Sequence, residues 1–255
     1  RLARPASPQS CRLTDRSGAS FMRVATSIAS GTAAELPPSR TLNERVYNQL
    51  REDILSGRLP AGSRLPFAQL PERYPAGTGT LREALARLVS DNLVVGEGQK
   101  GFRVSPISRE DLEDITRLRC NLEAGALRDA IRHGDAAWEA RVLAATHRLS
   151  RYHQSVRKGP PLLAPEGAAL HRSFHLVLFE TCGSRWQRRV IEQLYDHSER
   201  YRRLSSIRQS PDRDSDAEHR AIVDEVLARR SAAAATLLVQ HIERTTHELV
   251  QAIFT

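Results

Sequence analysis

The spacing of apolar residues along the first patterned segment predicts a unit of three helices and a β-hairpin. Apolar residues recur at helical intervals over 41–55, and SGRLPAGSRLP then ends the pattern with glycines and prolines. A short helix follows over about 66–73, and TGTLREALARLVSDN predicts a third helix with its leucines on one face. LVVGEGQKGFRV is two β-prone runs around a glycine-rich turn, which predicts a hairpin. We expect one domain over 41–106.

From Ser108 onward the pattern is helical throughout. Ser108 is predicted to cap the first helix, and Gly134 and Gly183 mark helix ends. Short connections between successive helices favour an α-helical bundle over 107–255. The expected helices run over about 109–132, 135–156, 165–182, 184–206, 212–229 and 231–253.

Residues 1–40 differ from the rest of the chain in composition. They are rich in Ser, Ala, Thr, Pro and Arg and show no lasting periodicity, which predicts a disordered basic segment. The single methionine is Met22, so we expect translation to start there and residues 1–21 not to be native.

The charge of the chain favours an anionic partner near its N-terminal end. The formal net charge is +8, and the first 106 residues hold 15 basic and 9 acidic residues. The three cysteines are far apart and predict neither a disulfide framework nor a zinc module. Without a secretory signal or an apolar run long enough for a membrane span, we expect a cytoplasmic protein with no membrane partner.

The order of elements in 41–106 is that of a winged helix-turn-helix, in which the third helix enters the major groove. The first turn of that helix would offer small hydroxyls and one guanidinium to base edges or phosphate, and the hairpin tip an amide and an ammonium. A charged surface helix is most often only solvated, so the complete order of elements carries the interpretation. The candidate DNA-binding residues are Thr78, Gly79, Thr80, Arg82, Gln99 and Lys100.

Four of the nine histidines can converge inside the helical bundle. His171 and His175 lie four residues apart and share a helix face. His219 and His241 lie toward the same end of the last two helices if these are antiparallel. The spacing alone allows a metal site or hydrogen-bonded core histidines, and the latter are commoner. HExxH, GxSxG and nucleotide-binding glycine motifs are absent, which disfavours an enzyme.

Several stretches resemble one bacterial family. RVYNQLREDILSGRLPAGSRL, TLREALARLVSDNLV and GFRVSPIS resemble the DNA-binding domain of GntR-family repressors. RLRCNLEA, FHLVLFE, EHRAIVDEVLAR and LLVQHIE resemble the FCD domain of the FadR subfamily. The likeness covers about 41–253, and NLVVGEGQKGFRVSPIS with HRSFH most resembles the CsiR-type repressors of glutarate and γ-aminobutyrate catabolism. The resemblance implies a mainly α fold and a metabolite-responsive regulator. It also implies a homodimer that binds operator DNA as two half-sites.

The resemblance also implies a divalent metal held by an Asp and three His. His175, His219 and His241 match the motif, whereas His171 stands where the family usually has Asp or Asn. Four neutral imidazoles leave the ion's charge uncompensated, so we expect Zn²⁺ or Ni²⁺ and a small carboxylate effector at the metal. Arg119 is either a second clamp for that effector or the partner of Glu123 in a buried ion pair.

The same resemblance shows one departure in the reading helix, because Thr78 stands where the family usually has arginine. Two other classes remain open: a metal-dependent enzyme with an accessory nucleic-acid-binding domain, and a non-specific nucleoid-type binder.

Overall fold

The computed structural model describes residues 41–156, 165–204 and 213–255. The predicted disordered segment 1–40 lies outside these residues. Two bodies of secondary structure follow one another along the described chain, each with its own apolar core. No helix in these described ranges is both long and apolar enough to cross a lipid bilayer.

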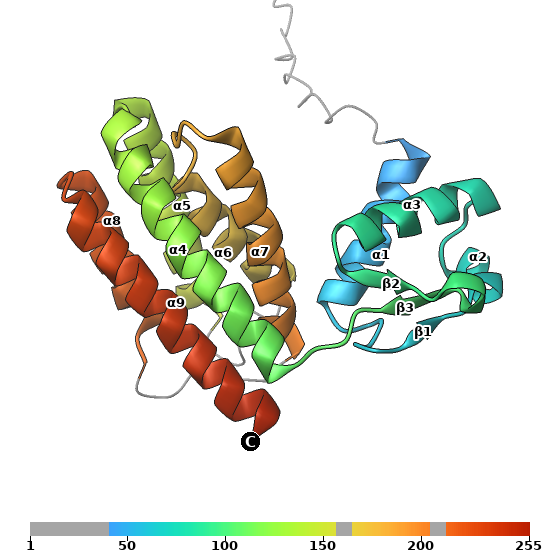
Figure 1. The fold of residues 1–255 in the computed structure, drawn as a ribbon. Coiled ribbons are helices and arrows are strands. Elements are labelled where there is room, and N and C mark those ends of the chain that lie inside the picture. Colours follow the sequence, from blue (N-terminus) through green and yellow to red (C-terminus); the bar gives the residue numbers. More distant parts are fainter. Residues whose placement is uncertain (1–40, 157–164, 205–212) are drawn as a thin grey trace, which may run out of the picture. The chain divides into compact units, whose positions relative to one another are not determined.

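The first body contains three α-helices and a small sheet (Figure 1). Its elements are α1 (Leu42–Leu55), β1 (Arg64–Leu65), η1 (Phe67–Gln69), α2 (Leu70–Arg73), α3 (Thr78–Ser90), β2 (Val94–Gly96), η2 (Gly98–Lys100) and β3 (Phe102–Val104). The sheet is antiparallel with β3 in the centre, in the order β1-β3-β2. The expected hairpin is therefore present, and β1 adds a third strand that the sequence pattern did not predict.

The core of this body explains why its helices form where the apolar spacing placed them. Leu81, Leu85 and Leu88 on α3 are completely buried, as is Leu50 on α1. Thr41 caps α1 through a capping box with Glu44, because each side chain accepts from the backbone N–H of the other residue. The cap fixes where α1 begins, and the buried leucines fix which face of α3 points into the core.

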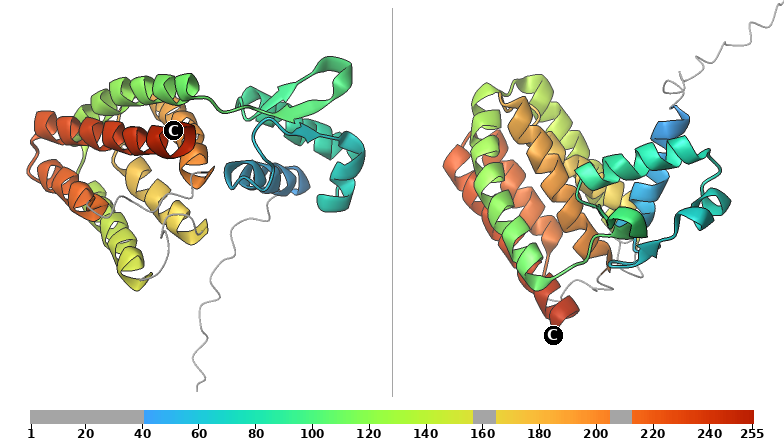
Figure 2. Two further views of the ribbon diagram at one scale, coloured as in Figure 1. Left: turned by 90° about the horizontal axis from the view of Figure 1, so that it is seen from below. Right: turned by 45° about the vertical axis from the view of Figure 1, so that its right-hand side comes forward.

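The second body is a bundle of six helices within the described residues. They are α4 (Arg109–His133), α5 (Ala136–Ser155), α6 (Pro165–Val177), α7 (Arg185–Leu204), α8 (Ser215–Leu227) and α9 (Ser231–Phe254). Figure 2 shows α4 and α9, in green and red, side by side in both views. Helix α4 also packs against α7, α5 against α6 and α8, and α8 against α9. The mainly α fold is as expected, with a winged helix followed by a helical bundle.

The helix boundaries follow local signals, with one exception. The Ser108 hydroxyl accepts from the backbone N–H of Asp111, so the predicted N-cap of α4 is present. Helix α6 ends at Val177, five residues before the expected end at 182. Beyond it the chain tightens into turns, because the N–H groups of Phe179 and Cys182 donate to carbonyls three residues back.

The turn between α4 and α5 holds the bundle together through one aromatic ring. Gly134 ends α4, and its Cα lies against the ring of Trp138, which is completely buried. The indole Nε1 of Trp138 donates to the carbonyl of Val177 at 2.8 Å, the last residue of α6. One side chain therefore links the turn, α5 and the end of α6.

Candidate metal centre and nucleic-acid interface

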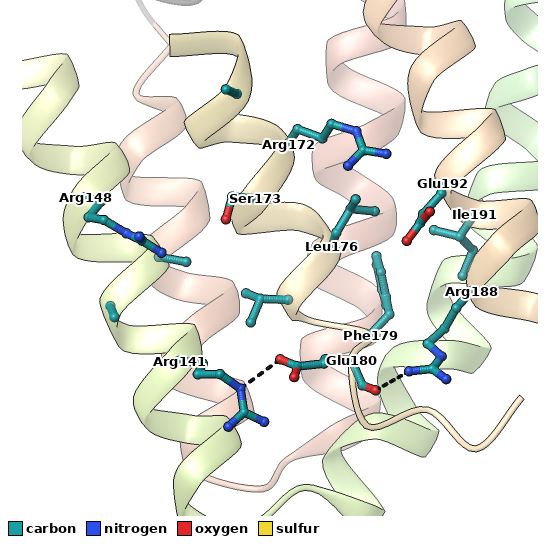
Figure 3. A pocket seen from close by; sticks show the side chains of 14 residues that line it. Arg141, Arg148, Arg172, Ser173, Leu176, Phe179, Glu180, Arg188, Ile191 and Glu192 are labelled. Atoms are coloured by element: carbon teal, nitrogen blue, oxygen red, sulfur yellow. Dashed lines mark hydrogen bonds and ion pairs between the residues drawn. The ribbon is translucent and has the colours of Figure 1, made fainter. Parts of the chain in front are cut away.

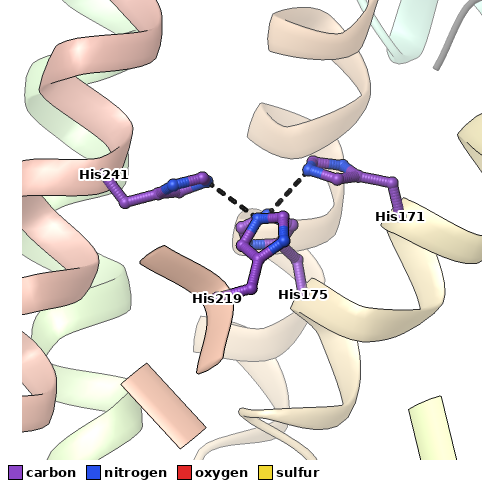
Figure 4. Close-up of side chains that lie close together, drawn as sticks. All are labelled: His171, His175, His219 and His241. Atoms are coloured by element: carbon purple, nitrogen blue, oxygen red, sulfur yellow. Dashed lines mark hydrogen bonds between the residues drawn. The ribbon is translucent and has the colours of Figure 1, made fainter. Parts of the chain in front are cut away.

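Four imidazoles from three helices meet inside the bundle (Figure 4). His171 and His175 lie on α6, His219 on α8 and His241 on α9. One nitrogen from each ring lies within 4.8 Å of the others, and all four side chains are buried. The sequence prediction that these four residues converge agrees with this geometry, and we call them the four-histidine cluster.

The helices set the spacing of the rings. On α6 the four-residue interval places the centroids of His171 and His175 4.4 Å apart. Because α8 and α9 pack together, the centroids of His219 and His241 lie 4.7 Å apart. The Nε2 atoms are 3.2 Å apart in the first pair and 3.3 Å apart in the second. The cluster is therefore two facing pairs, each joined through Nε2.

Burial keeps these rings neutral. It lowers the pKa of His171, His175 and His219 well below 6.5, and neighbouring positive charges and imidazoles add to the effect. Burial also lowers the pKa of His241 to about 4, although Glu218 opposes the change. Neutral imidazoles offer lone pairs, which is the state a metal requires.

An acidic residue beside the cluster sets the orientation of one ring. The Nδ1 of His241 lies 2.8 Å from Oε2 of Glu218, so Nδ1–H donates and Nε2 keeps its lone pair. Burial would raise the pKa of Glu218, but hydrogen bonds from His241, Arg213 and Arg244 hold it far below its usual range. Glu218 is therefore an anion at the edge of the cluster.

Two further polar side chains, Tyr195 and Arg202, face His171 from α7. The Tyr195 hydroxyl lies 2.6 Å from Nδ1 of His171, and Nη2 of Arg202 lies 2.9 Å from the same nitrogen. Burial raises the pKa of Tyr195 well above its usual value, so the hydroxyl keeps its proton. Arg202 also pairs with Glu199, which raises the pKa of Arg202 against the opposing effect of burial. A guanidinium thus stands directly beside the imidazoles.

The donor set fits a divalent transition metal. Two buried ring nitrogens, Nδ1 of His175 and Nδ1 of His219, have no hydrogen-bond partner, while the Nε2 atoms of the same rings point into the cluster. Four nitrogens about 2.0–2.1 Å from a tetrahedral zinc would be about 3.3 Å apart, close to the two Nε2 distances observed. All-nitrogen ligation suits zinc or nickel better than magnesium or manganese.

Arg119 lies near the cluster and already has protein partners. Its Nε donates to Oε1 of Glu123 at 2.6 Å and its Nη1 to the Ser198 hydroxyl at 2.9 Å. Glu123 has no exposed surface, and burial raises its pKa although Arg119 opposes the change. The ion pair, one of the two alternatives for Arg119, is present, and a contact with an effector stays a prediction.

Sequence reasoning did not identify Glu218, Tyr195 or Arg202. Glu218 directly precedes His219, and an acid beside a candidate ligand is a usable signal for an outer hydrogen-bond partner. Tyr195 and Arg202 lie seven residues apart, which places them on one face of α7. Nothing in the sequence alone says that this face meets α6.

The candidate DNA-reading residues lie at the start of α3. Thr78 and Gly79 are exposed in its first turn, Thr80 is half-buried, and Gly77 precedes them without a side-chain cap. The first backbone N–H groups of α3 therefore have no capping side chain, which suits a phosphate. The guanidinium of Arg82 is exposed and lies 5.2 Å from the centroid of the Phe67 ring, which limits its positions.

The hairpin tip is built for a sharp turn. Gly98 and Gly101 have φ of +60° and +91°, which other residues rarely adopt, and η2 lies between β2 and β3. Lys100 is exposed there, whereas the side chain of Gln99 lies outside the described part of the structure. Contacts of Lys100 and Gln99 with DNA stay predictions.

Comparisons with known proteins match both bodies. Residues 42–104 match the model of bacterial regulatory proteins of the gntR family, and residues 114–244 match the FCD domain. The chain is 41% identical over 217 residues to the HTH-type transcriptional regulator BphR of Paraburkholderia xenovorans, which covers 85% of this chain and 89% of BphR. It is 35% identical over 200 residues to the HTH-type transcriptional repressor GlaR of Escherichia coli, covering 77% and 90% of the two chains.

Solved structures share the fold. The E. coli protein McbR/YncC superposes with a TM-score of 0.70 at 22% identity, covering 83% of this chain and 98% of its own. A GntR regulator from Rhodococcus sp. RHA1 gives a TM-score of 0.68 at 20% identity, covering 84% and 99%. At these identities the likeness concerns the fold alone.

Proposed function

Because this chain belongs to the GntR family of bacterial regulatory proteins and carries an FCD domain, we propose that it is a repressor whose effector binds at the four-histidine cluster. The role in transcriptional regulation follows from the family itself. The chain is a DNA-binding transcriptional regulator, and its family matches and relatives are regulators rather than enzymes. Repression is supported by the likeness to GlaR, a repressor of the same family.

The observation that carries the proposal is the arrangement of the four imidazoles. Their Nε2 atoms face one another in a buried space, and each helix contributes rings that are neutral at physiological pH. We propose that His171, His175, His219 and His241 hold one divalent ion, with zinc or nickel favoured. When bound, the metal would supply positive charge and an open position for an anionic ligand.

The effector we propose is a small carboxylate. Four neutral ligands leave the +2 charge of the ion in place, and the guanidinium of Arg202 beside His171 adds to the local positive potential. Arg119, whose guanidinium lies 5.3 Å from the centroid of the Tyr195 ring, is a further candidate contact. Glutarate and related dicarboxylates of the CsiR-type catabolic repressors are the first to be tried.

We further propose that a homodimer in the cytoplasm binds a pseudopalindromic operator with its two winged helices. In this proposal residues 41–106 are the DNA-binding domain and 107–255 the effector-binding and dimerisation domain, a division that the separate apolar cores of the two bodies support. Within this scheme the effector must have a higher affinity for the state that does not bind DNA. It can shift the equilibrium only by the difference between its binding free energies for the two states.

Metal analysis of the purified full-length protein tests the proposal. We expect about one zinc or nickel ion per chain by inductively coupled plasma mass spectrometry, and loss of most of it in His175→Ala. His147→Ala, which removes an exposed histidine of α5, is the matched control and should keep the metal. In His171→Asp we expect retention of an ion with a shift toward manganese, because a carboxylate replaces one nitrogen.

A gel shift on the DNA upstream of the gene completes the test. We expect the protein to bind in excess competitor DNA and a small carboxylate to release it only from metal-loaded protein. Protein with all four histidines that holds no metal after mild purification would end the proposal. Binding that competitor DNA abolishes would instead favour a non-specific nucleoid-type binder.

A further inference from the structure

A groove on the helical bundle, outside the four-histidine cluster, combines a basic rim with an apolar floor (Figure 3). It lies between α5, α6, α7 and the turns that follow α6, and its volume is about 630 Å³. Cavities of several hundred cubic ångströms hold one small organic molecule. We call it the arginine groove.

The rim of the arginine groove carries four guanidinium groups and two carboxylates. Arg141 and Arg148 come from α5 on one side and Arg188 from α7 on the other, and Arg172 of α6 lies in the upper part of the view of Figure 3. The acidic residues of the rim are Glu180 and Glu192. The rim is therefore net positive, which favours an anionic ligand.

The hydrogen bonds of these arginines differ, and the difference singles out one of them. Nε of Arg141 donates to Oε2 of Glu180 at 2.9 Å, and Nη1 of Arg188 donates to the backbone carbonyl of Glu180 at 2.7 Å. Arg172 pairs with Asp196 at 3.0 Å. In the described part of the chain Arg148 makes neither an ion pair nor a hydrogen bond, so its fork of donors is available to a ligand.

The floor of the groove is apolar. Leu176 and Val177 of α6 are half-buried and form its accessible part, with Leu176 projecting into the groove, and the buried side chains of Phe179 and Ile191 also line it. An inorganic anion would leave this floor in contact with water, whereas a molecule with an apolar body would cover it. The combination therefore fits an organic anion, with a carboxylate at the rim and a ring or short alkyl chain on the floor.

The groove and the four-histidine cluster lie on opposite faces of α6. Ala169, Arg172, Ser173 and Leu176 face the groove, at intervals of three and four residues along one side of the helix. His171 and His175 point from the other side into the bundle. The groove is therefore a separate site that shares one helix with the cluster.

We propose that the arginine groove is a second ligand site of this regulator, which binds an organic monocarboxylate with an apolar body through Arg148. Arg141 on the same helix and Arg188 across the groove add to the positive rim, and Leu176 and Val177 would contact the apolar body. This site does not depend on a metal, so it stands or falls apart from the function proposed for the four-histidine cluster.

Isothermal titration of the full-length protein with benzoate tests the site, with acetate as the probe that lacks an apolar body. We expect saturable binding of benzoate. The affinity for acetate should be at least about 10-fold lower than that for benzoate, because acetate leaves the apolar floor uncovered. Arg148→Gln should weaken benzoate binding about 10-fold or more, since a charge-assisted bidentate contact is lost. Arg151→Gln, an exposed arginine of α5 outside the groove, is the matched control and should bind as the wild type does.

The same titration on chelator-treated and zinc-reloaded protein separates the groove from the cluster. We expect equal benzoate binding in both preparations when circular dichroism shows that the fold is kept. Binding that needs the metal and ignores Arg148→Gln places the anion at the cluster and overturns the proposal. Absence of saturable binding, or a change of oligomeric mass in Arg148→Gln that marks the groove as covered by a second copy, also overturns it.

Discussion

Neutral histidines, buried together, make the helical domain sensitive to acid. In the unfolded chain each imidazole takes up a proton near pH 6.5, whereas burial lowers the folded-state pKa of His241 to about 4. Between these two values the unfolded state binds more protons than the folded state. The free energy of unfolding therefore falls as the pH drops through this window.

We predict that metal-free protein loses stability from about pH 6.5 down to about pH 4. The loss from His241 alone is on the order of 3 kcal/mol, from a pKa lowered by about 2.5 units. Urea denaturation followed by circular dichroism at several pH values measures it. His241→Gln should reduce the slope of the profile by the part that His241 contributes, because the other three buried histidines remain, whereas replacing the exposed His147 should leave it unchanged. A wild-type profile without slope would contradict the prediction.

The site could be predicted from the sequence only as far as local spacing reaches. His171 and His175 share a helix face whatever the surroundings, and the antiparallel order of α8 and α9 brings His219 and His241 together. The contact of Arg202 with His171 depends on the packing of α7 against the cluster, and a long side chain can reach in several directions. Arg119 illustrates the same limit, since its two alternatives differ only in where the guanidinium points.

At the scale of elements, the turn between α4 and α5 is the most constrained connection. A Cβ on Gly134 would collide with the ring of Trp138, and that ring cannot move without exposing itself or breaking its hydrogen bond to Val177. Gly134 is therefore required for the close approach of backbone and ring rather than for an unusual φ, which is −65°.

We predict that Gly134→Ala destabilises the protein by about 1–3 kcal/mol, the usual cost of overpacking a rigid core. Urea denaturation at pH 7.5 measures the change. Gly125→Ala in α4 is the matched control, because its Cβ would lie 3.4 Å from Nε2 of Gln187, at the limit of ordinary contact, and alanine favours a helix. Equal stability of the two variants would refute the role given to the Trp138 ring.

Elements with a long apolar period could be predicted, as could short ones bounded by turn residues, whereas strand β1 and the early end of α6 could not. The six helices of 107–255 lie close to their expected ranges, because twelve or more residues give a clear period. Strand β1 has two residues, too few for any alternation, and exists because Arg64 and Leu65 pair with β3. Helix α6 ends early because Phe179 and Cys182 are buried through turns, although their apolar spacing continues the helical pattern.

For the whole molecule, the proposed dimer determines how a DNA-contact mutation acts. Each chain of the dimer contacts one half-site, so a substitution removes the same DNA contact twice and its cost in binding free energy doubles. We predict that Arg82→Ala costs about 2–6 kcal/mol of operator affinity, twice the 1–3 kcal/mol of one good base contact. Gel shifts at one fixed salt concentration measure this loss of affinity. Light scattering should give about twice the 28.5 kDa chain mass if the protein is a dimer.

A mixed dimer with one Arg82→Ala chain should lie midway between the two homodimers on a logarithmic affinity scale. Arg132→Ala, which removes an exposed positive charge from α4, controls for the change in net charge and should bind the operator nearly normally. A monomeric mass would disprove the dimer, and unchanged affinity in Arg82→Ala would remove that residue from the reading surface.

Helix α6 bears the imidazoles on one face and the arginine groove on the other, and thermodynamic linkage attaches a condition to that arrangement. If an anion in the groove changes the affinity of the cluster for metal by some factor, the metal must change the affinity of the groove for that anion by the same factor. The equal benzoate binding expected with and without zinc corresponds to a factor of one. In that case the metal and the organic acid would bind to the two faces of α6 independently of each other.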